Sequence, residues 1–343
     1  MIGTVTWKEL RSQPDAWQQL LTRIRGRAAF PDISLHQMDE VLLVGSGSSY
    51  YLALAVADWI GRRSPIRIGV LPSCEVMLDP ERVSGTRTSQ RRLAIAFSRS
   101  GESTEALLAV AVLKKSGFEI LSVSCQGDNS LMRMSDHRLP VPEGREDGLV
   151  MLRSFTGMLI AAQVLFGSAA DLTALSTLPD VGRSLLDRHQ EDLKSFARSR
   201  PFDRFVFLGS GPAYPLALEA SLKVQEMACT TSEAYHTLEY RHGPKTTATS
   251  RTLVTIFGPG DVERGQSLAR DMKALGAAVM VVAGDATPYH AVADVTVSLG
   301  AELSNSVSAS AALLPAQIVA CETAMRVGHD PDAPVNLSKV VVL

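Results

Sequence analysis

The chain carries the same local pattern twice, and this repeat restricts its possible folds more than any other feature. Residues 40–51 read EVLLVGSGSSYY, and residues 204–215 read RFVFLGSGPAYP. Each copy is an apolar run, then Gly-Ser-Gly, then an apolar segment with helical periodicity. A further apolar run follows in each copy, LAIAF at 93–97 and LVTIF at 253–257. A repeated unit of this kind predicts two domains of the same architecture.

The apolar runs predict the type of sheet. Two more of them occur, ILSVSC at 120–125 and VMVVAG at 279–284. Continuous apolar runs that alternate with helices are typical of parallel strands covered on both faces. We therefore expect an α/β protein with two tandem doubly wound, flavodoxin-like parallel sheets. The expected parts are an N-terminal helical extension at 1–29 with its helix from about Trp7 to Arg25, a first domain at 30–168, a helical connector at 169–194, a second domain at 195–330 and a tail at 331–343.

Charge and composition exclude several classes of function. The net charge is -2 and the basic residues are dispersed, so nothing favours nucleic acid or an anionic membrane as a partner. No stretch approaches the roughly 18 apolar residues of a membrane span. The four cysteines are far apart and form no CxxC pair, which argues against structural zinc or a disulfide framework. We expect a cytoplasmic protein without a metal or cofactor.

Two Ser- and Gly-rich turns, GSGSS at 45–49 and SRSGES at 98–103, each follow an expected strand and precede an expected helix. The carboxyl ends of parallel strands meet at the edge where ligands bind. Helix N-termini and clustered hydroxyls donate hydrogen bonds that suit a phosphate monoester. Either turn alone is explained equally well by ordinary turn and N-cap preferences. The two together predict a phosphate site.

Two further observations restrict the kind of ligand and the number of such sites that we expect. Tyr50 and Tyr214 occupy the third glycine position of GxGxxG, which disfavours a dinucleotide cofactor. The second domain has Gly258-Pro259-Gly260-Asp261 in place of the Ser-rich turn. We therefore expect one phosphate site in the pair of domains.

A second group of residues has acid–base character. Glu219, Lys223 and Glu226 share one face of the expected helix 216–227, where a solvated salt-bridge stripe is the ordinary explanation. His242 follows in the segment EYRHGPK, at a chain reversal where a histidine can move protons near neutral pH. Aldose–ketose isomerisation needs a base that moves a proton between C1 and C2 and a second group that opens the ring. Lys339, in the tail, would ordinarily be solvated, but a tail folded over a pocket would let it form an imine with an open-chain ketose.

Taken together, the motifs resemble the sugar-isomerase (SIS) family, and within it the isomerase half of glucosamine-6-phosphate synthase. The resemblance covers almost the whole chain. It rests on GSS at 47–49, SRSGES at 98–103, LEASLKVQE at 218–226, EAY at 233–235, RHGP at 241–244 and NLSK at 336–339.

The resemblance implies a role for each group. Glu226 would shuttle the C1/C2 proton, Lys223 would stabilise the enediolate charge, and His242 would assist ring opening from the neighbouring subunit of a homodimer. Lys339 would form the Schiff base with fructose 6-phosphate. The phosphate would be held by Gly47, Ser48, Ser49, Ser98, Arg99, Ser100, Gly101 and Ser103. The sugar would contact the segment 144–155, through Glu146, Leu149 and Met151.

The chain departs from that synthase in two respects. The first sugar domain begins within the first forty or so residues, so we expect no glutaminase activity. The segment 144–155 is also less polar than its counterpart. The expected reaction is the conversion of glucosamine 6-phosphate to fructose 6-phosphate and ammonia. The alternatives are a fructosamine-6-phosphate deglycase, a galactosamine-6-phosphate deaminase/tagatose-6-phosphate isomerase, and a non-catalytic sugar-phosphate sensor.

Overall fold

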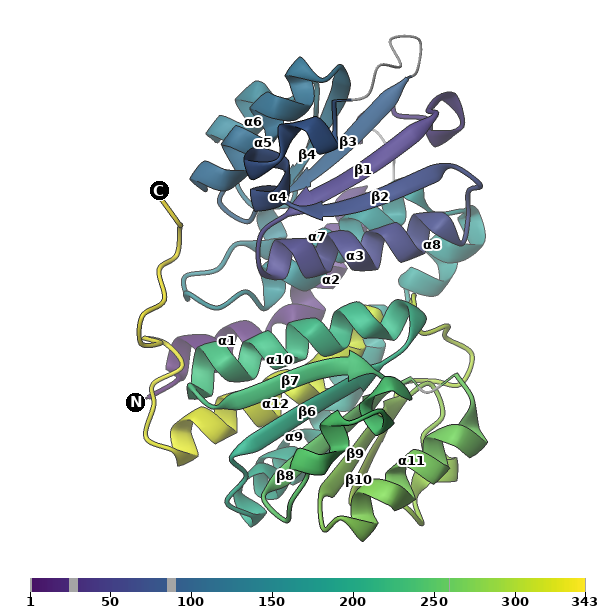
Figure 1. The fold of residues 1–343 in the computed structure, drawn as a ribbon, viewed down its shortest axis with the longest axis vertical. Helices are drawn as coiled ribbons and strands as arrows, with labels where there is room; N and C mark the ends of the chain where they lie inside the picture. Colours follow the sequence, from purple (N-terminus) through teal and green to yellow (C-terminus); the bar gives the residue numbers. More distant parts are fainter. Residues whose placement is uncertain (1, 25–29, 85–90, 259, 343) are drawn as a thin grey trace. The chain divides into compact units, whose positions relative to one another are not determined.

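The strands form two five-stranded sheets, and every described pairing in them is parallel (Figure 1). The computed structural model describes residues 2–24, 30–84, 91–258 and 260–342. The strand order is β2-β1-β3-β4-β5 in the first sheet and β10-β9-β8-β6-β7 in the second. Counted from the first strand of each sheet, both orders are 2-1-3-4-5, the flavodoxin-like arrangement. The structure therefore confirms the tandem α/β fold that the repeat predicts.

The strands of the first sheet are β1 (Glu40–Gly45), β2 (Arg67–Pro72), β3 (Arg92–Phe97), β4 (Phe118–Ser124) and β5 (His137–Pro140). Those of the second are β6 (Arg204–Gly209), β7 (Thr231–His236), β8 (Thr252–Phe257), β9 (Ala278–Ala283) and β10 (Val295–Ser298). In β3, β8 and β9 every residue is buried. Their apolar runs leave no face for water, because helices cover both sides.

By its internal contacts the chain divides into two compact units. The first-sheet unit comprises residues 15–147, 151–176 and 338–343, and the second-sheet unit comprises residues 1–14, 148–150 and 177–337. The start of the chain thus belongs with the second sheet, and its last residues belong with the first.

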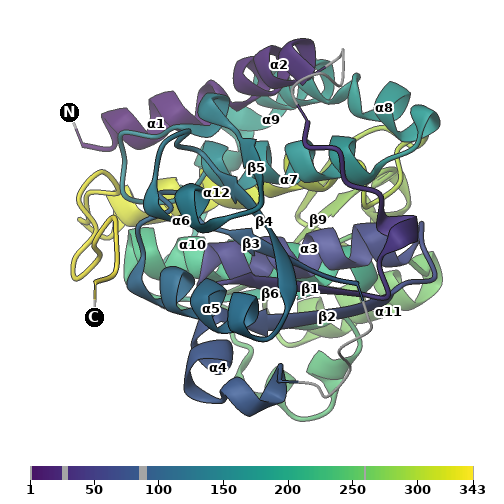
Figure 2. The same ribbon diagram turned by 90° about the horizontal axis from the view of Figure 1, so that it is seen from above.

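Helices cover both faces of the first sheet. On one face α3 (Ser48–Gly61) contacts α7 (Arg153–Phe166), and on the other α4 (Ser73–Leu78) contacts α5 (Thr104–Lys115) (Figure 2). The same unit holds α6 (Ser130–Met134), α8 (Ala169–Leu175) and most of α2 (Gln13–Ile24). The core beneath α5 is formed by aliphatic residues such as Val44, Ala94, Val110 and Ile120.

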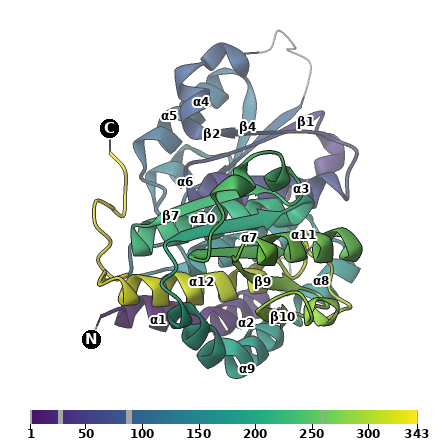
Figure 3. The ribbon, with the colours of Figure 1, turned by 60° about the horizontal axis from the view of Figure 1, so that its bottom comes forward.

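The second sheet is covered in a similar way. The helix α10 (Tyr214–Ala228) packs on β6 and β7, and α11 (Val262–Ala274) packs on β9. The long helices α9 (Leu178–Ser199) and α12 (Ala309–Arg326) lie side by side, and α12 also contacts α10 (Figure 3). The helix α9 covers much of the segment 169–194, in which the sequence predicts a helical connector.

The N-terminal segment differs from the expectation. In place of one helix it forms α1 (Thr4–Arg11) and α2, separated at Ser12. Pro14 lies in the first turn of α2, where its missing N–H is tolerated, but inside a continuous helix it would remove a hydrogen bond. Arg25, the expected end of the helix, lies outside the described residues.

Candidate active site

The first Ser-rich turn links β1 to α3 in the first-sheet unit. Gly47 has a φ of 55°, and α3 begins at Ser48. A Cβ on Gly45 would lie 2.4 Å from the carbonyl oxygen of Ser49, so this close turn needs glycine. Ser48 and Ser49 are both buried. The Ser46 hydroxyl is also buried, and no hydrogen-bond partner for it lies among the described residues.

The second Ser-rich turn follows β3, the neighbour of β1, so both turns lie at the same edge of the sheet, where the strand order reverses. Ser98 Oγ accepts a hydrogen bond from the Gly101 N–H at 3.1 Å, and Ser100 Oγ accepts one from the Glu102 N–H at 3.2 Å. Ser103 is the N-cap residue of α5. The turn is thus rigid and sets its hydroxyls against a helix N-terminus, which is the arrangement that suits an anion.

The corresponding turn of the second sheet repeats the positive φ of its glycine, but it enters α10 through a 3-10 turn at Gly211–Ala213 and its side chains are arranged differently. Gly211 has a φ of 56°, close to that of Gly47. However, the Ser210 hydroxyl donates to Thr237 Oγ1 at 3.0 Å and accepts from the Thr237 N–H at 3.3 Å. This hydroxyl is therefore already engaged within the protein. Pro259, in the second turn of this sheet, lies outside the described residues.

The acidic residues of α10 surround a buried lysine. The Lys223 side chain is fully buried, with its ammonium 3.2 Å from Glu219 Oε1 and 2.5 Å from Glu226 Oε2. Burial alone would lower the pKa of Lys223, but the two carboxylates outweigh it and the pKa is raised. Glu219 is also fully buried, whereas the Glu226 side chain retains some exposure. The solvated salt-bridge stripe is therefore wrong for Glu219 and Lys223.

His242 lies beyond β7, after a short 3-10 turn at Glu239–Arg241. Its backbone N–H donates to the Glu239 carbonyl at 3.0 Å, and its side chain is exposed. An exposed imidazole at a fixed turn can exchange protons with solvent or with a ligand.

Glu146 caps a helix. Its carboxylate is fully buried and accepts hydrogen bonds from the N–H groups of Leu152 and Ser154 and from the Ser154 hydroxyl. These donors lie at the start of α7, where a negative charge is favourable. Leu149 and Met151, the other two expected sugar contacts, are half-buried in the loop that the carboxylate closes.

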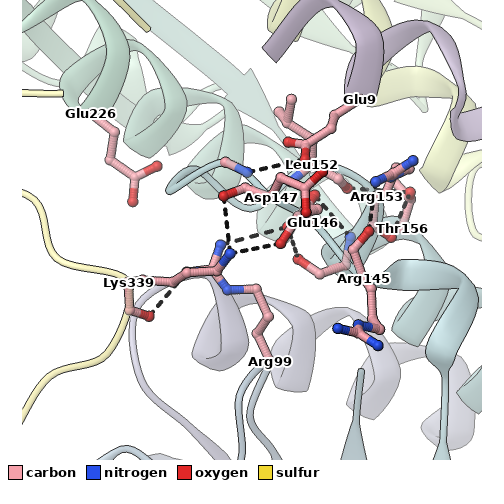
Figure 4. Close-up of polar contacts among 12 residues, drawn as sticks. Glu9, Arg99, Arg145, Glu146, Asp147, Leu152, Arg153, Thr156, Glu226 and Lys339 are labelled. Atoms are coloured by element: carbon pink, nitrogen blue, oxygen red, sulfur yellow. Dashed lines mark hydrogen bonds and ion pairs between the residues drawn. The ribbon is translucent and has the colours of Figure 1, made fainter. Parts of the chain in front are cut away.

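Lys339 is held by the same loop. Its ammonium donates to the carbonyls of Glu146 at 2.7 Å and Asp147 at 3.0 Å (Figure 4). Arg99 donates to the carbonyl of Lys339 at 3.1 Å and lies 3.6 Å from the Glu146 carboxylate. A further bond from the Thr104 N–H to the Val341 carbonyl, at 3.2 Å, fixes the end of the tail. The tail lysine is therefore ordered against the first-sheet unit.

The structure adds two candidates that sequence reasoning left out of the site. The buried Ser46 hydroxyl belongs to the first Ser-rich turn, and its place in that turn is its only sequence signal. Glu219 shares the helix face of Glu226, but its pairing with Lys223 depends on burial, which spacing does not reveal. Among the described residues, no group of three His, Cys, Asp or Glu is placed to hold a metal ion, and no helix is long and apolar enough to cross a membrane.

Comparison with known sequences identifies related proteins. The SIS domain family matches residues 34–168 and 200–325. The isomerizing glutamine–fructose-6-phosphate aminotransferase of Pyrobaculum aerophilum is 30% identical over 320 residues, which are 88% of this chain and 51% of that protein. The enzyme of the same name from Sulfurisphaera tokodaii is 26% identical, over 98% of this chain and 56% of that protein. The chain thus spans about half the length of the curated relatives that it matches.

Solved structures match over nearly their full length. The glucosamine-6-phosphate deaminase of Thermotoga maritima is 32% identical, with a TM-score of 0.80, and the match covers 99% of this chain and 100% of that one. The tagatose-6-phosphate ketose/aldose isomerase of Escherichia coli is 25% identical, with a TM-score of 0.87, and the match covers 97% and 95% of the two chains.

Proposed function

This chain belongs to the SIS-domain family, and from that premise we propose that it is an amino-sugar-phosphate deaminase/isomerase. The proposed reaction converts glucosamine 6-phosphate and water to fructose 6-phosphate and ammonia. The likeness to the Thermotoga maritima deaminase along its whole length supports this choice of substrate.

The observation that carries the proposal is the buried pairing of Lys223 with Glu226. A buried ammonium is costly unless carboxylates neutralise it. On a solvated helix face no such neutralisation would be needed. Here the lysine fixes the position of Glu226, whose side chain is partly exposed. A positioned carboxylate with a cation beside it suits a proton shuttle next to a developing oxyanion.

Each residue then has a chemical role. The Ser-rich turns, with Ser46 added, bind the phosphate, and His242 assists ring opening. Glu226 removes the proton from C2 of the open-chain aldose and returns it to C1, which leaves an imine at C2. Lys339 displaces ammonia from that imine, and water then hydrolyses the lysine imine to release the ketose and regenerate the amine. One water is consumed and one ammonia is released.

The decisive experiment incubates the purified chain separately with glucosamine 6-phosphate and galactosamine 6-phosphate. Ammonia and ketose 6-phosphate are both followed over time. Equal amounts of the two products from glucosamine 6-phosphate are the expected result. If neither product forms, although the phosphates raise the melting temperature, deamination is rejected, and 6-phosphorylated fructosamines become the next substrates to test.

A second candidate is the galactosamine-6-phosphate branch, in which tagatose 6-phosphate is the ketose. The TM-score of 0.87 to the Escherichia coli tagatose-6-phosphate isomerase favours it. The two candidates differ only in the configuration at C4. Products from galactosamine 6-phosphate alone would select this candidate over the first.

We also propose that the chain acts as a homodimer in which His242 of the partner subunit serves the site. The two inactive variants Glu226→Gln and His242→Ala provide the test. If the histidine acts across subunits, mixing and reassembling them restores about a quarter of the parental activity, because half of the dimers are mixed and each holds one intact site. Mixtures that stay inactive although the subunits have exchanged would place the histidine in its own subunit's site.

A further inference from the structure

A single peptide group joins the candidate imine-forming lysine to a residue of the N-terminal helix. The carbonyl oxygen of Asp147 accepts a hydrogen bond from Lys339 Nζ at 3.0 Å. The N–H of the same peptide group, on Gly148, donates to Glu9 Oε1 at 3.1 Å (Figure 4). The bond to Lys339 lies within the first-sheet unit, and the bond to Glu9 lies within the second-sheet unit. The peptide therefore has an ammonium at its oxygen and a carboxylate at its N–H.

This geometry couples the two side chains. A trans peptide is planar, so its N–H and C=O turn together as one rigid group. A carboxylate that fixes the direction of the Gly148 N–H consequently fixes the direction of the Asp147 carbonyl. Charged partners at both ends also polarise the peptide in the same sense, which strengthens both hydrogen bonds.

Gly148 is adapted to the contact. A Cβ at this position would lie 2.7 Å from Glu9 Oε2. Glu9 is only 2% exposed, so its carboxylate has little room to move away. Gly148 does not have the positive φ that would by itself require glycine. Its lack of a side chain is instead needed for space.

The helix that carries Glu9 is itself anchored near the base of the tail. Asp332 accepts hydrogen bonds from the N–H groups of Val5 at 2.9 Å and Thr6 at 2.7 Å, and Asp330 accepts one from the N–H of Gly3 at 3.0 Å. These acidic side chains satisfy the free donors at the start of α1. The same stretch of chain continues to Lys339. The helix is thus fixed where it can set the orientation of the peptide.

We propose that Glu9 is a positioning residue for Lys339, acting through the Asp147–Gly148 peptide, an inference that rests on the proposed role of Lys339 as the imine-forming amine. The Glu9 carboxylate fixes the direction of the Asp147 carbonyl, and that carbonyl accepts the hydrogen bond from the Lys339 ammonium. Without it the lysine spends more time away from the loop, and both its protection from reagents and its alignment with the ketose are lost.

Competitive acetylation of the full-length protein measures the first effect without requiring turnover. Acetylation of Lys339 is quantified by mass spectrometry relative to the exposed Lys115. In Glu9→Ala the ratio should rise about fivefold, the effect of losing roughly one hydrogen bond. Gly148→Ala should act similarly, and combining the two substitutions should add little because both break one contact. Glu9→Gln, which keeps an acceptor oxygen, should fall between wild type and Glu9→Ala.

The matched control is Gln13→Leu. Gln13 is also fully buried near α1, but its amide donates to Gln317 at 2.7 Å rather than to the loop. This variant should lower the melting temperature without changing the acetylation ratio of Lys339. An unchanged ratio in Glu9→Ala, or an equal rise in Gln13→Leu, would overturn the positioning role.

Trapping with fructose 6-phosphate and cyanoborohydride separates this inference from the proposed function. A reduced adduct on Lys339 in the wild type, formed about fivefold more slowly in Glu9→Ala, supports both. In the deaminase assay kcat should fall while KM stays unchanged, as expected when only the reacting amine is misplaced. A wild type without adduct rejects the imine role of Lys339, and the acetylation ratio still decides whether Glu9 positions it.

Discussion

The sharpest prediction at the scale of single residues concerns Glu226. Glu226→Gln keeps the shape of the side chain and an oxygen that can accept from Lys223, but it cannot take up and return a proton. We expect kcat to fall by about a thousandfold, within the usual range for a general base, while sugar-phosphate binding survives. Turnover and ligand-induced thermal stabilisation measure the two effects. Glu191→Gln, at an exposed position of α9, is the control, and parental turnover in Glu226→Gln would reject the assignment.

Lys223 provides a test of stability at the same scale. Lys223→Met fills a similar volume but leaves Glu219 and Glu226 facing each other without their shared cation. Removal of one partner from a buried ionic group typically costs about 3–5 kcal/mol. Urea unfolding should show a loss of that size, and adding Glu219→Gln should recover part of it. If the double variant is no more stable than the single one, repulsion between the carboxylates is not the cause.

At the scale of elements, the sequence predicts the interior of each sheet and misses its edges. The apolar runs correspond to the inner strands β1, β3, β4, β6, β8 and β9. The strands without such a run, β2, β5, β7 and β10, are those at the edges. An edge strand is short or half-buried, so its residues need not be uniformly apolar. The strand β7, which contains the segment EAY, accordingly has no apolar run that predicts a strand.

The candidate site likewise has features that the sequence predicts and features that it does not. The two Ser-rich turns and the charged face of α10 follow local rules of spacing, so the sequence shows them. The contact of Glu9 with Gly148, by contrast, joins residues far apart in the chain. No local periodicity marks such contacts, because they depend on packing between elements.

The start of α8 yields a prediction about pH. Hydrogen bonds from Arg63, and from Ser168 in a capping box, hold the pKa of Asp171 well below its usual range. A carboxyl whose pKa is lowered by folding stabilises the protein above its unfolded pKa of about 3.9, and this contribution fades as the pH falls below that value. Asp171→Asn should therefore cost about 1 kcal/mol at pH 7, and the difference from wild type should shrink in acid.

Thermal unfolding of both proteins from pH 7 to pH 3 measures this change. Asp180→Asn, which breaks an exposed ion pair with Arg183, should have little effect at any pH. A penalty for Asp171→Asn that stays constant down to pH 3 would show that its charge does not matter.

At the scale of the whole molecule, the two units share one topology but differ at the edge where doubly wound sheets generally bind ligands. Gly47 and Gly211 have nearly the same φ in the first turns of the two sheets. In the first-sheet unit, Ser46 retains a buried hydroxyl for which the described residues supply no partner. In the second-sheet unit, the hydroxyl of Ser210 is engaged with Thr237. The two copies thus share one fold, whereas the hydroxyl arrangement suited to an anion is found in the first-sheet unit.

This difference predicts how the protein responds to ligands. Glucosamine 6-phosphate at about 100 times its Kd should add about 2.7 kcal/mol to the stability of the folded state, a rise of several degrees in Tm. Glucosamine, without the phosphate, should leave Tm unchanged. The double variant Ser98→Ala/Ser100→Ala should abolish the rise, whereas Ser210→Ala should retain it. If Ser210→Ala loses the rise in Tm while Ser98→Ala/Ser100→Ala retains it, the phosphate site belongs to the second sheet. The same titration would then contradict the division of roles inferred from the two turns.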